Sequence, residues 1–419
     1  MASESEIKKK IMSRGLSGLV NVGNTCYMNS GLQCLSACNM FLSYFLKKSF
    51  INDLKDNLIE NYKKEQSKDP KYREIKINYT MSITYNYYKL LSAMWFKNRE
   101  IVPESFKKFL GYHCKTFRGT KQQDSQEFIN TLLDLIHEET KREVNIKIRQ
   151  AQISEEVCNY IGLRRSLVDK NNNATTDEER IEAERELNIF LENNQDNEIY
   201  YNSLIYWKKY MSSNYSIVTQ LFTGLYSSIV TCLECKTKSA SFEPFNILQL
   251  PIPEKEKATL KECLDDYTKT EKLDDDNKFH CSKCSKKVDS EKRLTLWNTP
   301  AYLIIQLKRF RSDVRSRHKV NTYIDYPLKD LSLEDNFNEQ RKRNYKYDLI
   351  GIVRHMGSLD GGHYVAYTKN PINNLWYYFD DSKVRGLVEV DDFSEIEKII
   401  QTKEAYILFY KKQNNIEDK

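Results

Sequence analysis

The residue types needed for nucleophilic acyl transfer are present in this chain, beginning with a cysteine near the N-terminus. Cys26 follows the turn-like triplet Gly23-Asn24-Thr25 and begins an apolar stretch that predicts a helix. A thiol at a helix N-terminus lies at the positive end of the helix dipole, so we expect the dipole to favour the nucleophilic thiolate. Most cysteines are small core residues, so a catalytic interpretation needs a base, an orienting acid and an oxyanion donor.

The candidate base is one of six histidines. His363 begins a predicted strand directly after Gly361 and Gly362, and glycines allow a loop to approach another group closely. His355 ends the preceding predicted strand and lacks such glycines, so we expect it to lie in a loop or to support the site indirectly. Two further histidines are expected to be structural or solvent-facing: His137 on a long helix and His280 beside a cysteine pair.

Two consecutive carboxylates could orient the imidazole. Asp380 and Asp381 follow an aromatic run at Trp376–Phe379. If that run pairs with a strand at Tyr364–Thr368, one carboxylate can reach His363 and fix its tautomer. Side chains alternate along a strand, so we expect the two carboxylates to lie on opposite sides. An Asp-Asp pair at a strand end is also common in turns.

An oxyanion donor could come from the segment before the cysteine. Asn21 stands five residues before Cys26, and its side-chain amide could donate to a developing oxyanion. Backbone N–H groups at the start of the helix could do the same. A turn-forming asparagine is the alternative interpretation.

Four cysteines have the spacing of a metal site. Cys232 and Cys235 form one Cys-x-x-Cys pair, Cys281 and Cys284 form another, and 45 residues separate the pairs. Two such knuckles complete a tetrahedral four-thiolate zinc shell without an open position, so the metal would be structural. The gap exceeds ordinary ribbon spacing, so the pairs must lie at the tips of two hairpins. Unrelated redox or core pairs are the alternative, and Cys263 is expected in the core.

The elements that must position these residues form an α+β pattern. From Gly18 to about His137 the apolar spacing is mostly helical, and Asp124 with Glu127 resembles a capping box at one helix start. Residues 138–200 are charged and Asn-rich, with an exposed helix expected at Thr175–Asn193. From Ser216 onward short β-branched and aromatic runs predict strands at Ser227–Thr231, Ala301–Leu307, Tyr347–Val353, Tyr364–Thr368, Trp376–Phe379 and Ala405–Tyr410.

Composition narrows the class of protein. Hydrophobic residues make up 40% and charged residues 30% of 419, which suits a soluble protein with a large core. No run of 18 apolar residues and no secretory signal is visible, so we expect an intracellular protein, cytoplasmic or nuclear, without a membrane span. Ten cysteines then indicate metal-binding or catalytic thiols rather than disulfides. A net charge of +6 does not by itself indicate nucleic-acid binding.

Taken together and in order, these motifs resemble those of the ubiquitin-specific proteases, a family of cysteine deubiquitinases. The match runs from about Gly15 to Lys411. Its segments are a cysteine box at Gly18–Leu35, a Gln-Gln-Asp box at Gln122–Phe128, the two cysteine pairs, a Leu-Lys-Arg-Phe strand at Leu303–Phe310, a histidine box at Tyr347–Tyr367 and an acid box at Trp376–Val384.

The resemblance implies a fold and a domain division. It implies a papain-like cysteine protease core in a thumb, palm and fingers arrangement, with a helical N-terminal half and an antiparallel β C-terminal half. Residues 15–137 would form the thumb, 138–205 a charged insertion, 220–298 the zinc-binding fingers and 299–411 the palm. Residues 1–14 and 412–419 would be polar tails.

The resemblance also implies roles for residues at matching positions. Cys26 would be the nucleophile, His363 the base, Asp380 the third triad member, Asn21 the oxyanion donor and Asp381 a supporting second acid. The remaining implied contacts are with the C-terminal tail of the substrate, through Gln123, Asp124, Gly361 and Gly362. Two glycines would leave a narrow channel that suits a Gly-Gly terminus and rejects side chains.

Several functions stay open at this point. We expect an active thiol deubiquitinase that acts as a monomer on ubiquitin and ubiquitinated proteins, with one structural zinc and no catalytic cofactor. A catalytically silent ubiquitin-binding protein and a protease for a related modifier are the alternatives. The basic run at Lys308–Lys319 could bind nucleic acid, but such a run is more often a solvated strand end.

Overall fold

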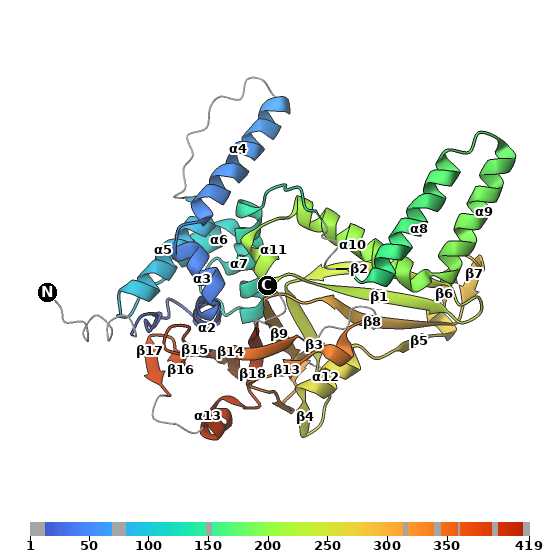
Figure 1. Ribbon diagram of the computed structural model, residues 1–419. Helices are drawn as coiled ribbons and strands as arrows, with labels where there is room; N and C mark the ends of the chain where they lie inside the picture. Colours follow the sequence, from blue (N-terminus) through green and yellow to red (C-terminus); the bar gives the residue numbers. More distant parts are fainter. Residues whose placement is uncertain are drawn as a thin grey trace.

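The computed structural model describes residues 13–68, 81–147, 153–312, 317–338, 345–358, 361–387 and 393–413. Helices dominate its N-terminal part and sheets its C-terminal part, as Figure 1 shows. The N-terminal helices are α2 (Cys26–Ala37), α3 (Asn39–Leu46), α4 (Phe50–Lys68), α5 (Ile83–Phe96), α6 (Glu104–His113), the short 3-10 helix η2 (Lys115–Phe117), α7 (Ser125–Thr140) and α11 (Ile217–Phe222).

Helix α2 is the central element of this part. All 12 of its residues are buried, because the helix lies between α7 and the large sheet. An added side-chain carbon at Gly31 would lie 3.0 Å from atoms of both Phe128 and Ile129, so this glycine sets the close approach of α2 to α7. A helix that is buried all round is mostly apolar, and the polar side chains it does bury need partners: the amides of Asn29 and Gln33 donate to the backbone carbonyls of Leu19 and Ser17.

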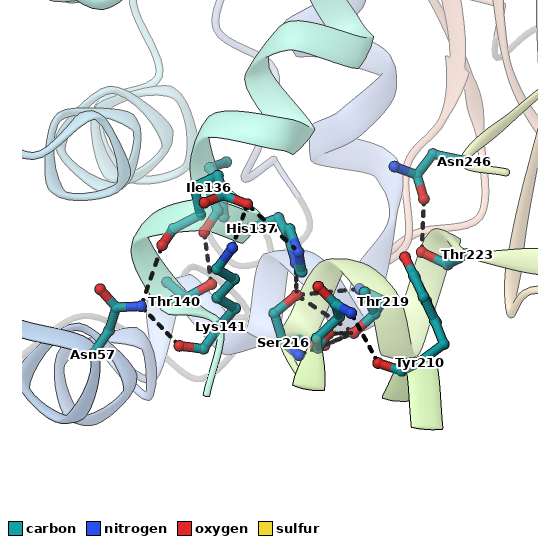
Figure 2. A network of polar contacts seen from close by, with 12 residues as sticks. Asn57, Ile136, His137, Thr140, Lys141, Tyr210, Ser216, Thr219, Thr223 and Asn246 are labelled. Carbon is teal, nitrogen blue, oxygen red and sulfur yellow. Dashed lines mark hydrogen bonds and ion pairs between the residues drawn. The ribbon is translucent and has the colours of Figure 1, made fainter. Parts of the chain in front are cut away.

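Side chains form hydrogen bonds with the backbone at both ends of helix α7. Asp124 caps its N-terminus by accepting from the backbone N–H groups of Gln126 and Glu127. At its C-terminal end, shown in Figure 2, Asn57 of α4 donates to the carbonyls of Glu138 and Lys141. In the same network the ring of His137 bonds the Ser216 hydroxyl at 2.8 Å, and Ser216 caps α11. His137 therefore has the structural role expected of it.

The palm is built on the largest sheet. Within the described residues this sheet has eight strands in the order β17-β16-β15-β14-β18-β9-β3, with β13 pairing on β14. Most neighbours are antiparallel, but β3 runs parallel to β9. The strands are β3 (Ile247–Pro251), β9 (Tyr302–Lys308), β13 (Leu331–Ser332), β14 (Lys346–Gly357), β15 (Gly362–Lys369), β16 (Trp376–Asp380), β17 (Lys383–Gly386) and β18 (Ala405–Lys412).

The fingers form a second sheet, ordered β2-β1-β8-β5, with a small hairpin β6–β7 at its tip. Its strands are β1 (Gly224–Cys232), β2 (Lys238–Phe245), β5 (Glu271–Leu273), β6 (Phe279–Cys281), β7 (Lys286–Val288) and β8 (Ser290–Asn298). Smaller elements at the palm are β4 (Lys257–Thr259), α12 (Leu260–Tyr267), β10 (Phe310–Ser312), β11 (Arg317–Lys319), β12 (Tyr323–Asp325) and α13 (Phe393–Ile400), and two further 3-10 turns are η4 (Asp275–Asn277) and η5 (Glu334–Asn336).

The charged segment after α7 folds into three helices: α8 (Glu155–Asn172), α9 (Asp177–Asn193) and α10 (Gln195–Ser213). The expected exposed helix is confirmed as α9, which begins at a capping box formed by Thr176 and Glu179. In Figure 1 the α8–α9 pair projects from the fingers. Helix α10 anchors the segment because Tyr200 packs against Trp297 of β8, and Trp297 against Phe242 of β2.

The predicted strands are confirmed: five lie within longer strands of the structure, and the one expected at Ala301–Leu307 is β9, shifted by one residue to Tyr302–Lys308. The parallel pairing of β3 with β9 was not expected from the sequence. Among the described residues, no helix combines the length and apolar character needed to cross a membrane.

Candidate functional site

Cys26 is the first residue of α2 and is 3% exposed. Burial raises the pKa of its thiol, hydrogen bonding from the backbone of Tyr364 opposes this, and the charge of Asp381 raises the pKa further. The backbone N–H groups of Cys26 and Tyr27 at the helix start lower the pKa in the expected direction, but burial outweighs them and the net pKa is raised. Desolvation of the thiol outweighs the dipole because the sheet and α7 enclose the start of the helix.

His363 and Asp380 are brought together by adjacent strands. β15 pairs with β16 through Ala366 and Phe379, and this register places the start of β15 beside the end of β16. The Nε2 atom of His363 lies 2.6 Å from Oδ1 of Asp380, and both side chains are partly exposed. Within the described residues, no hydrogen bond joins the Cys26 thiol to the His363 ring.

Asp381 lies on the same side of the site as Asp380, which corrects the expectation of opposite sides. One carboxylate oxygen of each residue and a ring nitrogen of His363 all lie within 4.8 Å of one another. The reason is that Asp381 is no longer in the strand: its φ of 50° places it in the turn between β16 and β17. Strand alternation therefore does not apply to it.

Two amides hold the Asp381 carboxylate. Asn21 donates to Oδ2 at 2.9 Å, and Asn29 donates to Oδ1 at 2.8 Å. Asn29 lies on α2 one turn after Cys26, and its amide also donates to the carbonyl of Leu19 at 3.1 Å. Sequence reasoning missed Asn29, although an amide within an apolar helix was the signal that could have identified it.

The Asn21 side chain is fixed at both ends. Its carbonyl oxygen accepts from the backbone N–H groups of Gly23 at 3.2 Å and Thr25 at 3.0 Å. Its amide nitrogen carries two hydrogens, and Asp381 uses one of them. The turn that precedes α2 thus presents an oriented amide donor near the thiol.

A cleft of about 580 Å³ lies beside this site. Two of its lining residues, Gln123 and Asp124, were predicted substrate contacts. The Asp124 carboxylate is already engaged, since it caps α7 and accepts from the Tyr406 hydroxyl at 2.6 Å. The complete lining is Asn24, Lys121, Gln122, Gln123, Asp124, Phe310, His355 and Tyr364.

The two glycines before the histidine differ in their surroundings. An added side-chain carbon at Gly362 would lie 2.2 Å from Nε2 of His355, so no side chain fits there. At Gly361 the same carbon would meet no atom within 4 Å. Gln122, which had no predicted role of its own, donates to the Gly362 carbonyl at 2.6 Å and accepts from its N–H at 3.4 Å.

His355 is buried beneath this loop, on β14, and is not in a loop itself. Burial lowers the pKa of its ring to about 4, and the neighbouring charge of Lys319 adds to the shift. A ring that stays neutral and has another partner is poorly suited to be the base. His363, with its carboxylate partner, is the better candidate.

The four predicted zinc ligands converge at the tip of the fingers. Cys232 and Cys235 span the β1–β2 turn, and Cys281 and Cys284 span the β6–β7 turn. Sulfur atoms of the two pairs lie 3.6 and 3.9 Å apart, and all four lie within 4.8 Å of one another. Tetrahedral zinc with Zn–S bonds of about 2.3 Å requires sulfur separations of about 3.8 Å, so the four residues fit the metal.

Each knuckle has the backbone expected of such a turn. The N–H groups of Cys235 and Cys284 point at the sulfur of the first cysteine of their pair, at 3.4 and 3.5 Å. The residues that follow, Lys236 and Ser285, have positive φ values of 59° and 54°. Cys263 is buried within α12 and does not belong to the cluster, as expected.

The basic run at Lys308–Lys319 is not a uniformly solvated strand end. Arg309 is completely buried and donates to the carbonyls of Ala405, Val320 and Thr322. Lys319 is partly buried and bonds His355. These two cations are taken up by internal contacts and do not contribute to an exposed basic surface.

Comparisons with known proteins place the chain in a family. The family model described as ubiquitin carboxyl-terminal hydrolase matches residues 17–410. Ubiquitin carboxyl-terminal hydrolase 2 of Gallus gallus is 32% identical over 402 residues, which cover 95% of this chain and 93% of that protein. The Rattus norvegicus protein of the same name is 29% identical over 402 residues, and these cover 95% of this chain and 54% of that protein. The chain thus spans about half the length of the rat relative.

A solved structure shows the same fold. The SAGA Ubp8/Sgf11/Sus1/Sgf73 DUB module bound to ubiquitin aldehyde matches with a TM-score of 0.64 and 23% identity, over 96% of this chain and 71% of that one. The predicted α+β fold of thumb, palm and fingers is confirmed by this likeness and by the elements described above. Because the family model covers nearly the whole chain, the protein belongs to the ubiquitin carboxyl-terminal hydrolase family, the ubiquitin-specific proteases that its motifs resemble.

Proposed function

We propose that this protein is a thiol-dependent deubiquitinase that hydrolyses the peptide or isopeptide bond at the C-terminal Gly-Gly of ubiquitin. The observation that carries the proposal is the pairing of His363 with Asp380 at 2.6 Å, beside the cleft and the helix start that holds Cys26. Family membership supports the reaction class, and the two carboxylates and two amides around the thiol supply the remaining functions.

The first step is proton transfer and attack. Because burial raises the pKa of the Cys26 thiol, the proton must pass to His363 when the substrate brings the two side chains together. The thiolate then forms a bond to the carbonyl carbon of the terminal glycine. Asp380 keeps the ring in the required tautomer and stabilises the imidazolium that results.

The tetrahedral oxyanion needs donors that are already oriented. The free amide hydrogen of Asn21 and backbone N–H groups at the start of α2 are the proposed donors. Asp381 acts through Asn21, because its carboxylate fixes the amide and is itself held by Asn29. A preoriented dipole stabilises the developing charge without reorganising in the transition state.

Collapse of the intermediate completes the acyl transfer. His363 gives its proton to the leaving lysine amine as the carbon–nitrogen bond breaks, and a thioester to Cys26 remains. Water then attacks the thioester carbonyl while His363 accepts a proton from it, and the carbon–sulfur bond breaks. The thiolate and the free carboxylate of ubiquitin are the products.

The cleft is the proposed channel for the ubiquitin tail. Gln123 and Asp124 line it, and an added side-chain carbon at Gly361 would meet no atom within 4 Å. Gly362 is not proposed to shape the channel. A glycine is needed there because a side chain would collide with His355. A tail without side chains suits a channel bounded by backbone and by engaged polar groups.

The proposed metal ion has a structural role. Cys232, Cys235, Cys281 and Cys284 would hold one zinc ion that supplies no chemistry to the reaction. Residues 15–137 would act as thumb, 220–298 as fingers and 299–411 as palm, with 138–205 as an insertion whose helices continue in the structure to Ser213.

Turnover of ubiquitin carrying a C-terminal fluorogenic amide, measured beside substrates built on related modifiers, tests the function. We expect turnover of the ubiquitin substrate and at least about 100-fold lower kcat/KM for the other modifiers, since complementary contacts discriminate between partners. Turnover of none by folded protein would favour a silent ubiquitin-binding protein. Preference for another modifier would replace ubiquitin as the substrate.

A further inference from the structure

A partly buried lysine is bonded to the loop that leads to His363. Lys319 is the last residue of β11, in the hairpin that β10 and β11 form. Its ammonium lies 3.1 Å from Nδ1 of His355, 2.7 Å from the His355 carbonyl and 3.1 Å from the Gly357 carbonyl. Three acceptors on a segment more than 30 residues away in the chain therefore share one cation.

This cation is held without a carboxylate partner. Among the described residues, no acidic oxygen lies within ion-pair distance of the Lys319 ammonium. Burial lowers the pKa of Lys319 to about 8, the charge of Arg309 adds to this, and the more distant Glu404 opposes it. Burying an unpaired ammonium costs free energy, so its three neutral acceptors must be held firmly in place to compensate.

The contact fixes the state of the His355 ring. An ammonium can only donate, so Nδ1 of His355 must accept and the proton of the neutral ring resides on Nε2. The ring is 3% exposed and packs against Tyr364 at 4.6 Å and Phe310 at 5.2 Å between centroids. Tyr406 is a third aromatic neighbour, at 6.4 Å between centroids, so the position of the ring is set by one charged contact and three aromatic neighbours.

The loop before His363 rests on this ring. Gly357 and Gly362 face each other at the end of the β14–β15 ladder, and Lys319 bonds the first of them. Gly362 lies directly against Nε2 of His355, and Gln122 bonds its carbonyl. The residue before His363 is therefore held from beneath by the Lys319–His355 pair and on its other side by Gln122.

We propose that Lys319 is a positioning residue that ties the β10–β11 hairpin to the turn before His363 and so sets where the His363 ring lies relative to Cys26. The proposal rests on the proposed function, in which His363 is the base. Lys319 itself does not line the cleft, so its effect on the reaction passes through His355 and the turn. It follows that disturbing this hairpin alters catalysis without touching the thiol.

Replacing Lys319 with methionine tests the proposal, because methionine keeps the length of the side chain and removes its donors. We expect kcat for the ubiquitin fluorogenic substrate to fall about tenfold while KM changes less than twofold. Lys308→Met is the matched control, since Lys308 belongs to the same basic run and is exposed, and it is expected to keep the wild-type kcat. Lys319→Arg, which restores a donating cation, is expected to recover most of the loss.

Amide hydrogen exchange gives a readout that does not depend on activity. Peptides covering 361–369 are expected to exchange faster in Lys319→Met than in wild type or Lys308→Met, because the turn loses its support. Lys319→Gln, which buries no charge, serves if the methionine variant fails to fold, and a smaller change in the same direction is expected.

The outcomes separate the two proposals. Unchanged kcat and unchanged exchange in the folded Lys319 variants of an active protein would overturn the positioning role. An arginine variant as slow as the methionine variant would also overturn it. If the Lys319 variants exchange faster but the wild-type protein never turns over a ubiquitin substrate, the structural role of Lys319 stands and the proposed function is refuted.

Discussion

Replacing His363 with alanine is expected to lower the turnover of a ubiquitin fluorogenic substrate by about 10³- to 10⁴-fold, the largest loss expected of any histidine in the chain. Two steps depend on this ring. The Cys26 thiol has a raised pKa because it is buried, so it needs a base to become nucleophilic. The leaving amine also needs a proton, which the same ring returns. KM should change little, because the lost interaction belongs to the chemical step.

His355 provides the comparison that makes this prediction specific. His355→Gln replaces the ring with a polar amide. It is expected to lower kcat about tenfold, since His355 supports the turn and transfers no proton. His113→Ala, at an exposed position on α6, is expected to have the wild-type rate. A His363→Ala variant that keeps more than a tenth of the activity, or a larger loss in His355→Gln, would show that the base has been assigned wrongly.

Loss of the metal is expected to have the largest effect on stability. Purified protein should hold about one zinc ion per chain, and Cys232→Ser should hold almost none. Structural zinc binds zinc-finger peptides with an apparent free energy of about 10–16 kcal/mol, and such binding energy would stabilise the folded knuckles. Metal analysis by mass spectrometry and thermal unfolding of the same samples measure both effects.

The structure extends this effect beyond the fingertip. The corner between α9 and α10 lies against the knuckles, where Gln195 accepts from the N–H of Lys238 at 2.7 Å and Glu192 pairs with Lys283 at 2.8 Å. Hydrogen exchange in this corner should therefore rise together with exchange in the fingertip when zinc is removed. Cys158→Ser, which changes a thiol outside the cluster, should keep the metal. Folded protein without zinc, or a Cys232→Ser variant of wild-type stability, would contradict the assignment.

The parts of the site that could be predicted from the sequence follow from local patterns. Aromatic and β-branched runs predicted β15 and β16. The prediction that an acid reaches His363 depended on these two strands pairing, and they do pair. The cluster of four cysteines followed from two cysteine pairs, because each knuckle is a local turn and only their meeting is long-range.

Other features could not be predicted because they depend on burial or on a single backbone angle. The raised pKa of the Cys26 thiol comes from the packing of α2 between the sheet and α7, which no local pattern reveals. The side on which Asp381 lies is set by a φ of 50° in one turn residue. Alternation along a strand predicted opposite sides for Asp380 and Asp381, but Asp381 lies in a turn, where alternation does not hold.

The supporting contacts were missed for a third reason, which is their distance along the chain. Gln122 bonds a residue 240 positions away, and Asn29 bonds one 352 positions away. The contact of Lys319 with His355 was hidden within a basic run that is partly exposed and partly internal. None of these side chains is distinctive within its own segment. Each has a role only because folding packs distant segments against one another.

The most direct test of the central claim is covalent capture of Cys26 by ubiquitin whose C-terminus carries a thiol-reactive group. Wild-type protein is expected to gain the mass of one ubiquitin at Cys26, located by peptide mapping, whereas Cys26→Ala gains none and Cys158→Ala labels like wild type. Attachment at any other cysteine, or no attachment to well-folded wild-type protein, would contradict the account.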